Sequence, residues 1–248
     1  MITNALILFI TAFLGGMAVF LIPKIKESYF KLALVFAGSY LFAITILHII
    51  PELFLGSMPH SQVGLFLLVG FFFQFFLELF TSGIEHGHIH ELPGKSNRKH
   101  STSGFVLIAG LAIHSIMEGS LLAHPTTIHE HHHAGGLLFG IIFHKVPAAF
   151  ALMSVLLASN TNRNLSLLLL FIFSIASPIG VILGDIFSKA QLISDYWMVA
   201  IFAFVSGNFL KISTTILFES SPDHHFNLRR TIISIIGALV AVLVEYLF

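Results

Sequence analysis

The chain has 248 residues, of which 56% are hydrophobic and only 10% are charged, and its mean hydropathy is +0.93. A sequence this apolar has too little polar surface for a soluble globule, which indicates an integral membrane protein. The formal net charge is +0 and gives no sign of a nucleic-acid partner, while the absence of cysteine excludes disulfides, thiolate metal ligands and cysteine nucleophiles.

Apolar stretches of roughly the 20 residues that a helix needs to cross a bilayer recur along the whole chain. There are eight, at residues 2–22, 32–53, 62–84, 103–123, 136–158, 165–186, 195–217 and 231–248. We therefore expect an all-α integral membrane protein with a single transmembrane domain over residues 1–248. The first stretch has no basic segment before it and no small-residue cleavage site after it, so we interpret it as a retained helix.

Lysine and arginine gather in alternate loops, as expected when an even number of helices crosses the membrane and the basic loops face the cytoplasm. The basic residues in or beside the first, third, fifth and seventh loops are Lys24, Lys26, Lys31, Lys95, Arg98, Lys99, Arg163, Arg229 and Arg230. Lys189 is the exception, and Lys145 and Lys211 lie inside predicted spans. This distribution predicts that both termini are extracytoplasmic.

In the second span, His48 and Glu52 are four residues apart near the predicted extracytoplasmic end, with Pro51 between them. Residues at this spacing share one helix face, and imidazole with carboxylate is a ligand set for zinc and related divalent metals. The pair is a candidate first binding point for incoming metal. A single buried histidine is more often a hydrogen-bonded core residue, so that alternative stays open.

The predicted cytoplasmic loop at residues 85–102 is rich in histidine, with His86, His88 and His90 flanked by carboxylates. Such a loop can contact a divalent metal without fixed geometry, which suits a weak collecting or sensing site. The alternative is a solvated linker whose histidines have no role.

In the fourth span, the sequence His114-Ser115-Ile116-Met117-Glu118-Gly119 places ionisable groups in apolar surroundings. Charge inside a membrane is costly and therefore usually functional. His114 and Glu118 are four residues apart, so both can contact one ion from the same helix face. The absence of thiolate ligands argues against copper(I).

The predicted extracytoplasmic loop at residues 124–135 holds a second histidine cluster: His129, His131, His132 and His133. We expect metal contact here too. A pH-sensing role is the alternative, because clustered imidazoles change charge near neutral pH. An expression tag is a poorer explanation, since this run is internal and interrupted.

In the fifth span, His144 and Lys145 are adjacent and point about 100° apart around a helix, so one can bind metal while the other tunes the local charge. Pro147 removes a backbone donor near them. The alternative is an ordinary helix kink with a lysine paired to a carboxylate. Glu78 and Glu118 are both candidate partners of Lys145.

The seventh span is polar, and its side chains either line a pathway or form hydrogen bonds between helices. They are Ser206, Asn208, Lys211, Ser213, Thr214 and Thr215, none of which we assign as a ligand. Small residues here and at Leu14-Gly15-Gly16 allow a homodimer without requiring one.

The ordered motifs resemble the ZIP (Zrt/Irt-like) divalent metal transporters: His-Ser-x-x-Glu-Gly in the fourth span, His-Lys-x-x-x-Ala in the fifth and Ser177-Pro178-Ile179-Gly180 in the sixth. The resemblance covers nearly the full length. It implies two inverted three-helix repeats around the fourth and fifth helices, and transport of metal into the cytosol. The metal ligands that it implies are His114, Glu118 and His144, with His48 and Glu52 as the polar pair of the second span.

The chain departs from many ZIP proteins at two fifth-span positions where carboxylates support a second metal. Lys145 and Ala148 stand there instead, which resembles the branch that contains short animal zinc importers. At an effective dielectric near 20, a unit charge about 5 Å from a dication repels it by roughly 6 to 7 kcal/mol before screening. We therefore expect a single-metal site with Lys145 as a charge-tuning residue.

These features predict a transporter of divalent metal, most simply zinc, with iron(II), manganese and cadmium as other candidate cargoes. We expect no resident cofactor. We also expect no use of ATP, because the sequence has no Walker-type loop. The default location for an importer is the plasma membrane. The alternative is an intramembrane zinc hydrolase, but the sequence has no His-Glu-x-x-His or Gly-x-Ser-x-Gly motif, so we do not expect an enzyme.

Overall fold

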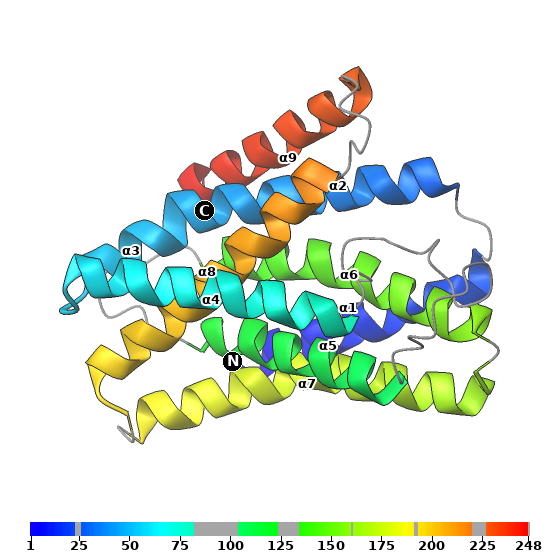
Figure 1. Ribbon diagram of the computed structural model, residues 1–248, viewed down its shortest axis with the longest axis horizontal. Coiled ribbons are helices and arrows are strands. Elements are labelled where there is room, and N and C mark those ends of the chain that lie inside the picture. The colour runs from blue at the N-terminus through cyan, green and yellow to red at the C-terminus, as the bar shows by residue number, and fades with distance from the viewer. Residues whose placement is uncertain are drawn as a thin grey trace.

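The computed structural model describes residues 1–22, 26–81, 104–123, 134–159, 161–190, 193–219 and 227–247. In these ranges every regular element is helical, so the all-α expectation is confirmed (Figure 1). One helical unit lies at each predicted span: α1 (Ile2–Leu21), α2 (Glu27–Ile44) continued by η1 (Thr45–Ile49) and α3 (Ile50–Leu55), α4 (His60–Thr81), α5 (Gly104–Leu121), α6 (Ala134–Ala158), α7 (Arg163–Lys189), α8 (Asp195–Glu219) and α9 (Leu228–Leu247).

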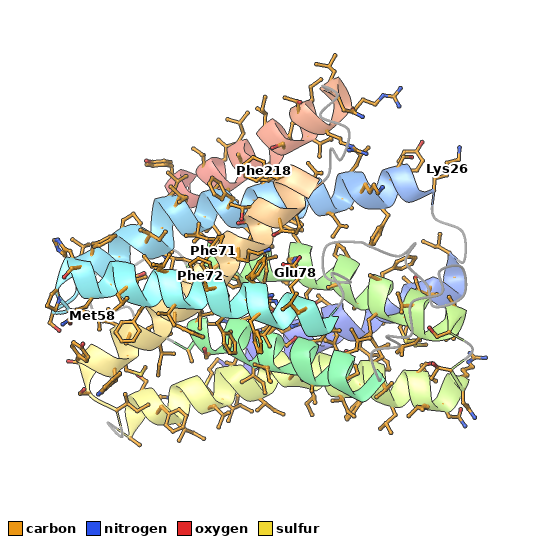
Figure 2. The ribbon with its side chains drawn as sticks, in the orientation of Figure 1. Lys26, Met58, Phe71, Phe72, Glu78 and Phe218 are labelled. Atoms are coloured by element: carbon orange, nitrogen blue, oxygen red, sulfur yellow. The ribbon has the colours of Figure 1, made fainter. Side chains whose placement is uncertain are left out.

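Six of the helical units in the described part of the chain are long and apolar enough to cross a membrane. They are α1, the α2–α3 unit, α4, α6, α7 and α8. Their outer faces carry exposed apolar side chains such as Phe72 on α4 and Phe218 on α8 (Figure 2). Apolar surface on this scale would be covered by lipid, as expected for a membrane protein.

The helices pack in pairs that join distant parts of the sequence. Helix α4 packs on α8, α5 on α7, α2 on α9 and α1 on α6. Figure 1 shows α9 beside α2 at one edge of the bundle and α7 at the opposite edge. The inward faces are apolar, with cores that include Tyr40 and Phe209 in one cluster and Leu152 and Phe173 in another. Buried ionisable groups are therefore exceptions that need a reason.

Glycines let α5 approach α7 closely, just beyond the His-Ser-x-x-Glu sequence. A Cβ atom on Gly119 would lie 2.0 Å from the backbone oxygen of Ser177, and one on Gly180 would lie 2.0 Å from that of Ile116. Neither contact is sterically allowed, so only glycine permits this backbone separation. This close contact fixes the position of the Glu118 region of α5 along α7.

A π-helical turn, η1, interrupts the second helical unit between α2 and α3. The amide of Ile50 donates to the carbonyl of Thr45, five residues earlier. Pro51 follows, and proline can neither donate to the carbonyl four residues before it nor avoid crowding that carbonyl, which favours a wider turn. The widened turn carries His48.

Candidate metal site

Three side chains with metal-ligand chemistry meet between α5 and α6. Nε2 of His114 lies 2.9 Å from Oε1 of Glu118, and Nε2 of His144 lies 3.8 Å from the same oxygen. One ligand atom from each residue lies within 4.8 Å of the other two. Ligands of a tetrahedral zinc ion are about 3.3 Å apart, as follows from zinc–ligand distances near 2.0–2.1 Å. The arrangement could therefore hold one metal ion.

This cluster is enclosed by protein. His114, Glu118 and His144 are 3%, 1% and 1% exposed. The two imidazole rings are 5.9 Å apart between centroids and nearly perpendicular, at 89°. The i, i+4 spacing on α5 brings His114 to Glu118, as the sequence predicted, whereas the position of His144 depends on the packing of α6.

Lys145 occupies the other side of Glu118. Its Nζ donates to Oε2 of Glu118 at 2.7 Å and to Oγ of Ser115 at 2.6 Å, and it lies 4.7 Å from the centre of the Phe173 ring. Lys145 is fully buried. The two carboxylate oxygens are therefore divided, with Oε1 toward the histidines and Oε2 toward the ammonium.

The structure also decides between the two candidate partners of Lys145. Glu78 on α4 (Figure 2) accepts from Lys211 of α8 at 2.5 Å, so Glu118 is the partner of Lys145. Lys211 also donates to Thr215. Both lysines that the sequence places within spans are thus paired with carboxylates.

The other polar residues of α8 mainly bond within their own helix. Ser206 donates to the carbonyl of Phe202, and Ser213 and Thr214 donate to carbonyls one turn earlier on α8. The contact of Asn208 crosses between helices, from Nδ2 to the sulfur of Met117 on α5 at 3.8 Å.

His48 and Glu52 lie together, but not as part of the buried group of three. Nε2 of His48 is 3.6 Å from Oε2 of Glu52. On the other edge of the ring, Nδ1 of His48 is 3.1 Å from Oε1 of Glu245 on α9. The side chains of His48, Glu52 and Glu245 are 16%, 24% and 13% exposed, so this cluster is more open than the first.

Glu245 and Ser115 had no predicted role, yet Glu245 contacts His48 and Ser115 accepts from Lys145. Glu245 carries the only charge in the predicted span at 231–248, and an isolated charge in a span is itself a signal of function. Ser115 lies within the His-Ser-x-x-Glu motif, but nothing in the motif indicates that it contacts a lysine of another helix.

The histidines of the two predicted loops lie outside the described residues, and the last two residues of the predicted loop at 124–135 belong to α6. The metal contacts predicted for His86, His88 and His90, and for His129, His131, His132 and His133, therefore stay predictions.

Comparisons with known proteins agree on one family. A family model described as ZIP Zinc transporter matches residues 1–245. The chain is 26% identical over 159 residues to "Zinc transporter ZIP9" of Micropogonias undulatus, covering 62% of this chain and 50% of that protein. It is 28% identical over 148 residues to "Protein zntD" of Dictyostelium discoideum, covering 58% of this chain and 21% of the relative. The matches thus span half or less of these relatives' length.

Proposed function

Because the chain belongs to the ZIP zinc transporter family, we propose that it carries a divalent metal, zinc in the first place, across a membrane into the cytosol. The observation that carries this proposal is the buried group formed by His114, Glu118 and His144, whose ligand atoms lie within 4.8 Å of one another. A site of two imidazoles and one carboxylate matches the ligand preference of zinc. Iron(II), manganese and cadmium accept the same groups.

We propose one metal per site. Oε1 of Glu118 faces the two histidines, whereas Lys145 holds Oε2 at 2.7 Å. A second dication would have to sit where this ammonium lies. Lys145 also keeps Glu118 paired when no metal is bound, so release of the ion leaves no uncompensated charge in the membrane. A carrier needs a stable metal-free state of this kind, because it must return empty to the side from which metal is taken up.

The helix pairing supports two inverted repeats, α1–α2–α4 and α7–α8–α9, around α5 and α6. The two repeats correspond when α1 is matched with α7, α2 with α8, α4 with α9 and α5 with α6. Under this matching the packed pair α4–α8 corresponds to α9–α2, and α5–α7 corresponds to α6–α1, and all four pairs are observed. In this scheme α5 and α9, which are not among the six long apolar helices, also cross the membrane and bring the number of spans to eight. The 20 residues of α9 reach about 30 Å, the thickness of a hydrocarbon core.

Inverted repeats suit alternating access, in which one bundle rocks against the other around a central site. In this mechanism metal binds first at His48 and Glu52 on the extracytoplasmic side. It then moves to the buried group and leaves toward the histidine-rich loop at residues 85–102. No enzymatic step is proposed, since the family is one of transporters. The plasma membrane and extracytoplasmic termini remain part of this proposal.

The test is uptake of zinc-65 by proteoliposomes that contain the purified protein, with protein-free liposomes as the control. We expect saturable accumulation without ATP. No accumulation above the control under imposed zinc gradients, proton gradients and membrane potentials would contradict the proposed function.

A further inference from the structure

The imidazole of His48 lies between two carboxylates that come from different helices. Glu52 lies in the first turn of α3, which directly follows the π-helical turn that carries His48, whereas Glu245 belongs to α9 at the other end of the sequence. Figure 1 shows the C-terminal end of the chain beside the second helical unit, and α9 packs there against both α2 and η1.

The two contacts differ in kind. Nδ1 of His48 is 3.1 Å from Oε1 of Glu245, which is hydrogen-bond distance, and Nε2 is 3.6 Å from Oε2 of Glu52, which is longer. An ionised carboxylate only accepts hydrogen bonds, so the bond to Glu245 requires the proton of the imidazole to be on Nδ1. In the neutral ring, Nε2 then presents its lone pair toward Glu52.

This is the arrangement that a metal-binding imidazole needs. Histidine ligands usually donate their second ring N–H to a carboxylate or carbonyl, which fixes the tautomer and orientation of the ring. The separation of 3.6 Å between Nε2 of His48 and Oε2 of Glu52 is close to the roughly 3.3 Å between two ligands of one zinc ion. Nε2 and the Glu52 carboxylate are thus placed to share an ion.

We propose that Glu245 is a positioning residue for metal capture, which acts by holding His48 so that Nε2 faces Glu52. The inference rests on the proposed transport function and deepens it, because it makes α9 part of the outer binding point. The partial exposure of all three side chains fits a point that meets metal before it is fully dehydrated. Glu245 itself does not need to touch the ion.

The experiment measures the kinetics of zinc-65 uptake for the wild type, Glu245→Ala, Glu245→Gln, His48→Ala and the double variant His48→Ala/Glu245→Ala. Loss of a carboxylate that orients a histidine ligand typically lowers metal affinity 10- to 100-fold. We expect Glu245→Ala to raise KM about tenfold with kcat little changed. Glu245→Gln keeps a hydrogen-bond acceptor and should restore most of the loss.

The double variant separates positioning from a general structural role. If Glu245 acts through His48, the KM of the double variant should equal that of His48→Ala alone. Ser234→Ala is the matched control on the same helix, because it removes the contact of Ser234 with Ser39 of α2 without touching the ionisable cluster. This control should leave KM unchanged.

The inference is overturned, with the transport function left intact, by an unchanged KM in Glu245→Ala or by an equal rise in KM whether or not His48 is present. A fall in kcat alone, shared with Ser234→Ala, would also overturn it by showing a packing defect. Absence of uptake by the wild type would overturn both the inference and the function on which it rests.

Discussion

Lys145 of α6 donates to Glu118 of α5, at 2.7 Å from Nζ to Oε2, with both side chains at most 1% exposed. An ammonium held against a metal-ligand carboxylate has two consequences. It neutralises the carboxylate when no ion is present, and it occupies space that a second ion would need. The predictions for Lys145 follow from this pair.

Replacing Lys145 by methionine removes the ammonium but keeps much of the side-chain volume. Because Glu118 is then a buried carboxylate without its cation, we expect destabilisation of the metal-free protein by about 3–5 kcal/mol. Zinc should restore much of the loss by binding the same carboxylate. Thermal unfolding in detergent, with and without zinc, measures both effects.

Lys211→Met is the matched control, since it breaks the other lysine–carboxylate pair, with Glu78. It should destabilise the protein without an enlarged response to zinc. Equal responses to zinc in the two variants would contradict a special relation between Lys145 and the metal site.

Replacing Lys145 by aspartate reverses the charge beside Glu118. A carboxylate there would attract a second dication where the ammonium repelled one, so we expect bound zinc to rise from about one to about two per chain. Elemental analysis of the purified variant gives the ratio, and zinc-65 uptake gives the rate. The single-metal assignment fails if both the ratio and the uptake rate stay at their wild-type values.

Gly180 on α7 should not accept a side chain. A Cβ atom there would lie 2.0 Å from the backbone oxygen of Ile116, so Gly180→Ala must push α5 away from α7. Overpacking typically costs about 1–3 kcal/mol, and backbone contact places this case at or above the upper end. We expect a lower unfolding temperature and weaker zinc binding.

Gly64 on α4 provides the control for Gly180. Among the described residues, no atom lies within 4 Å of a Cβ built at Gly64. Gly64→Ala should be neutral or stabilising by up to about 1 kcal/mol, because alanine favours the helix. Similar losses in both variants would show that the α5–α7 contact is not the cause.

Local patterns predicted part of the site and tertiary packing determined the rest. The contact between His114 and Glu118 follows from four-residue spacing on one helix. The choice of Glu118 over Glu78 as partner of Lys145 does not, because it depends on how the bundle arranges α4, α5 and α6 in space. Glu245 is 197 residues from His48 in sequence, so no local pattern indicates their contact.

For the fold, too, local sequence predicted one part and tertiary packing determined the other. Hydropathy predicted the positions of the helices, since apolar length alone determines them. It did not predict the π-helical turn at His48, because that turn depends on how the backbone accommodates Pro51. It also did not predict the pairing of α5 with α7. That pairing depends on Gly119 of α5 and Gly180 of α7 lying where the two backbones come closest.

We propose that metal crosses the membrane through the group of His114, Glu118 and His144. The most direct measurement is zinc-65 uptake by proteoliposomes with matched amounts of wild type, His114→Ala, Glu118→Gln and Glu78→Gln. Glu78→Gln is the control, because Glu78 is another carboxylate paired with a lysine, Lys211, and is not part of the group of three ligands. We predict that His114→Ala and Glu118→Gln abolish saturable uptake while Glu78→Gln retains it. Wild-type uptake in the His114 and Glu118 variants, or equal loss in all three, would contradict the claim.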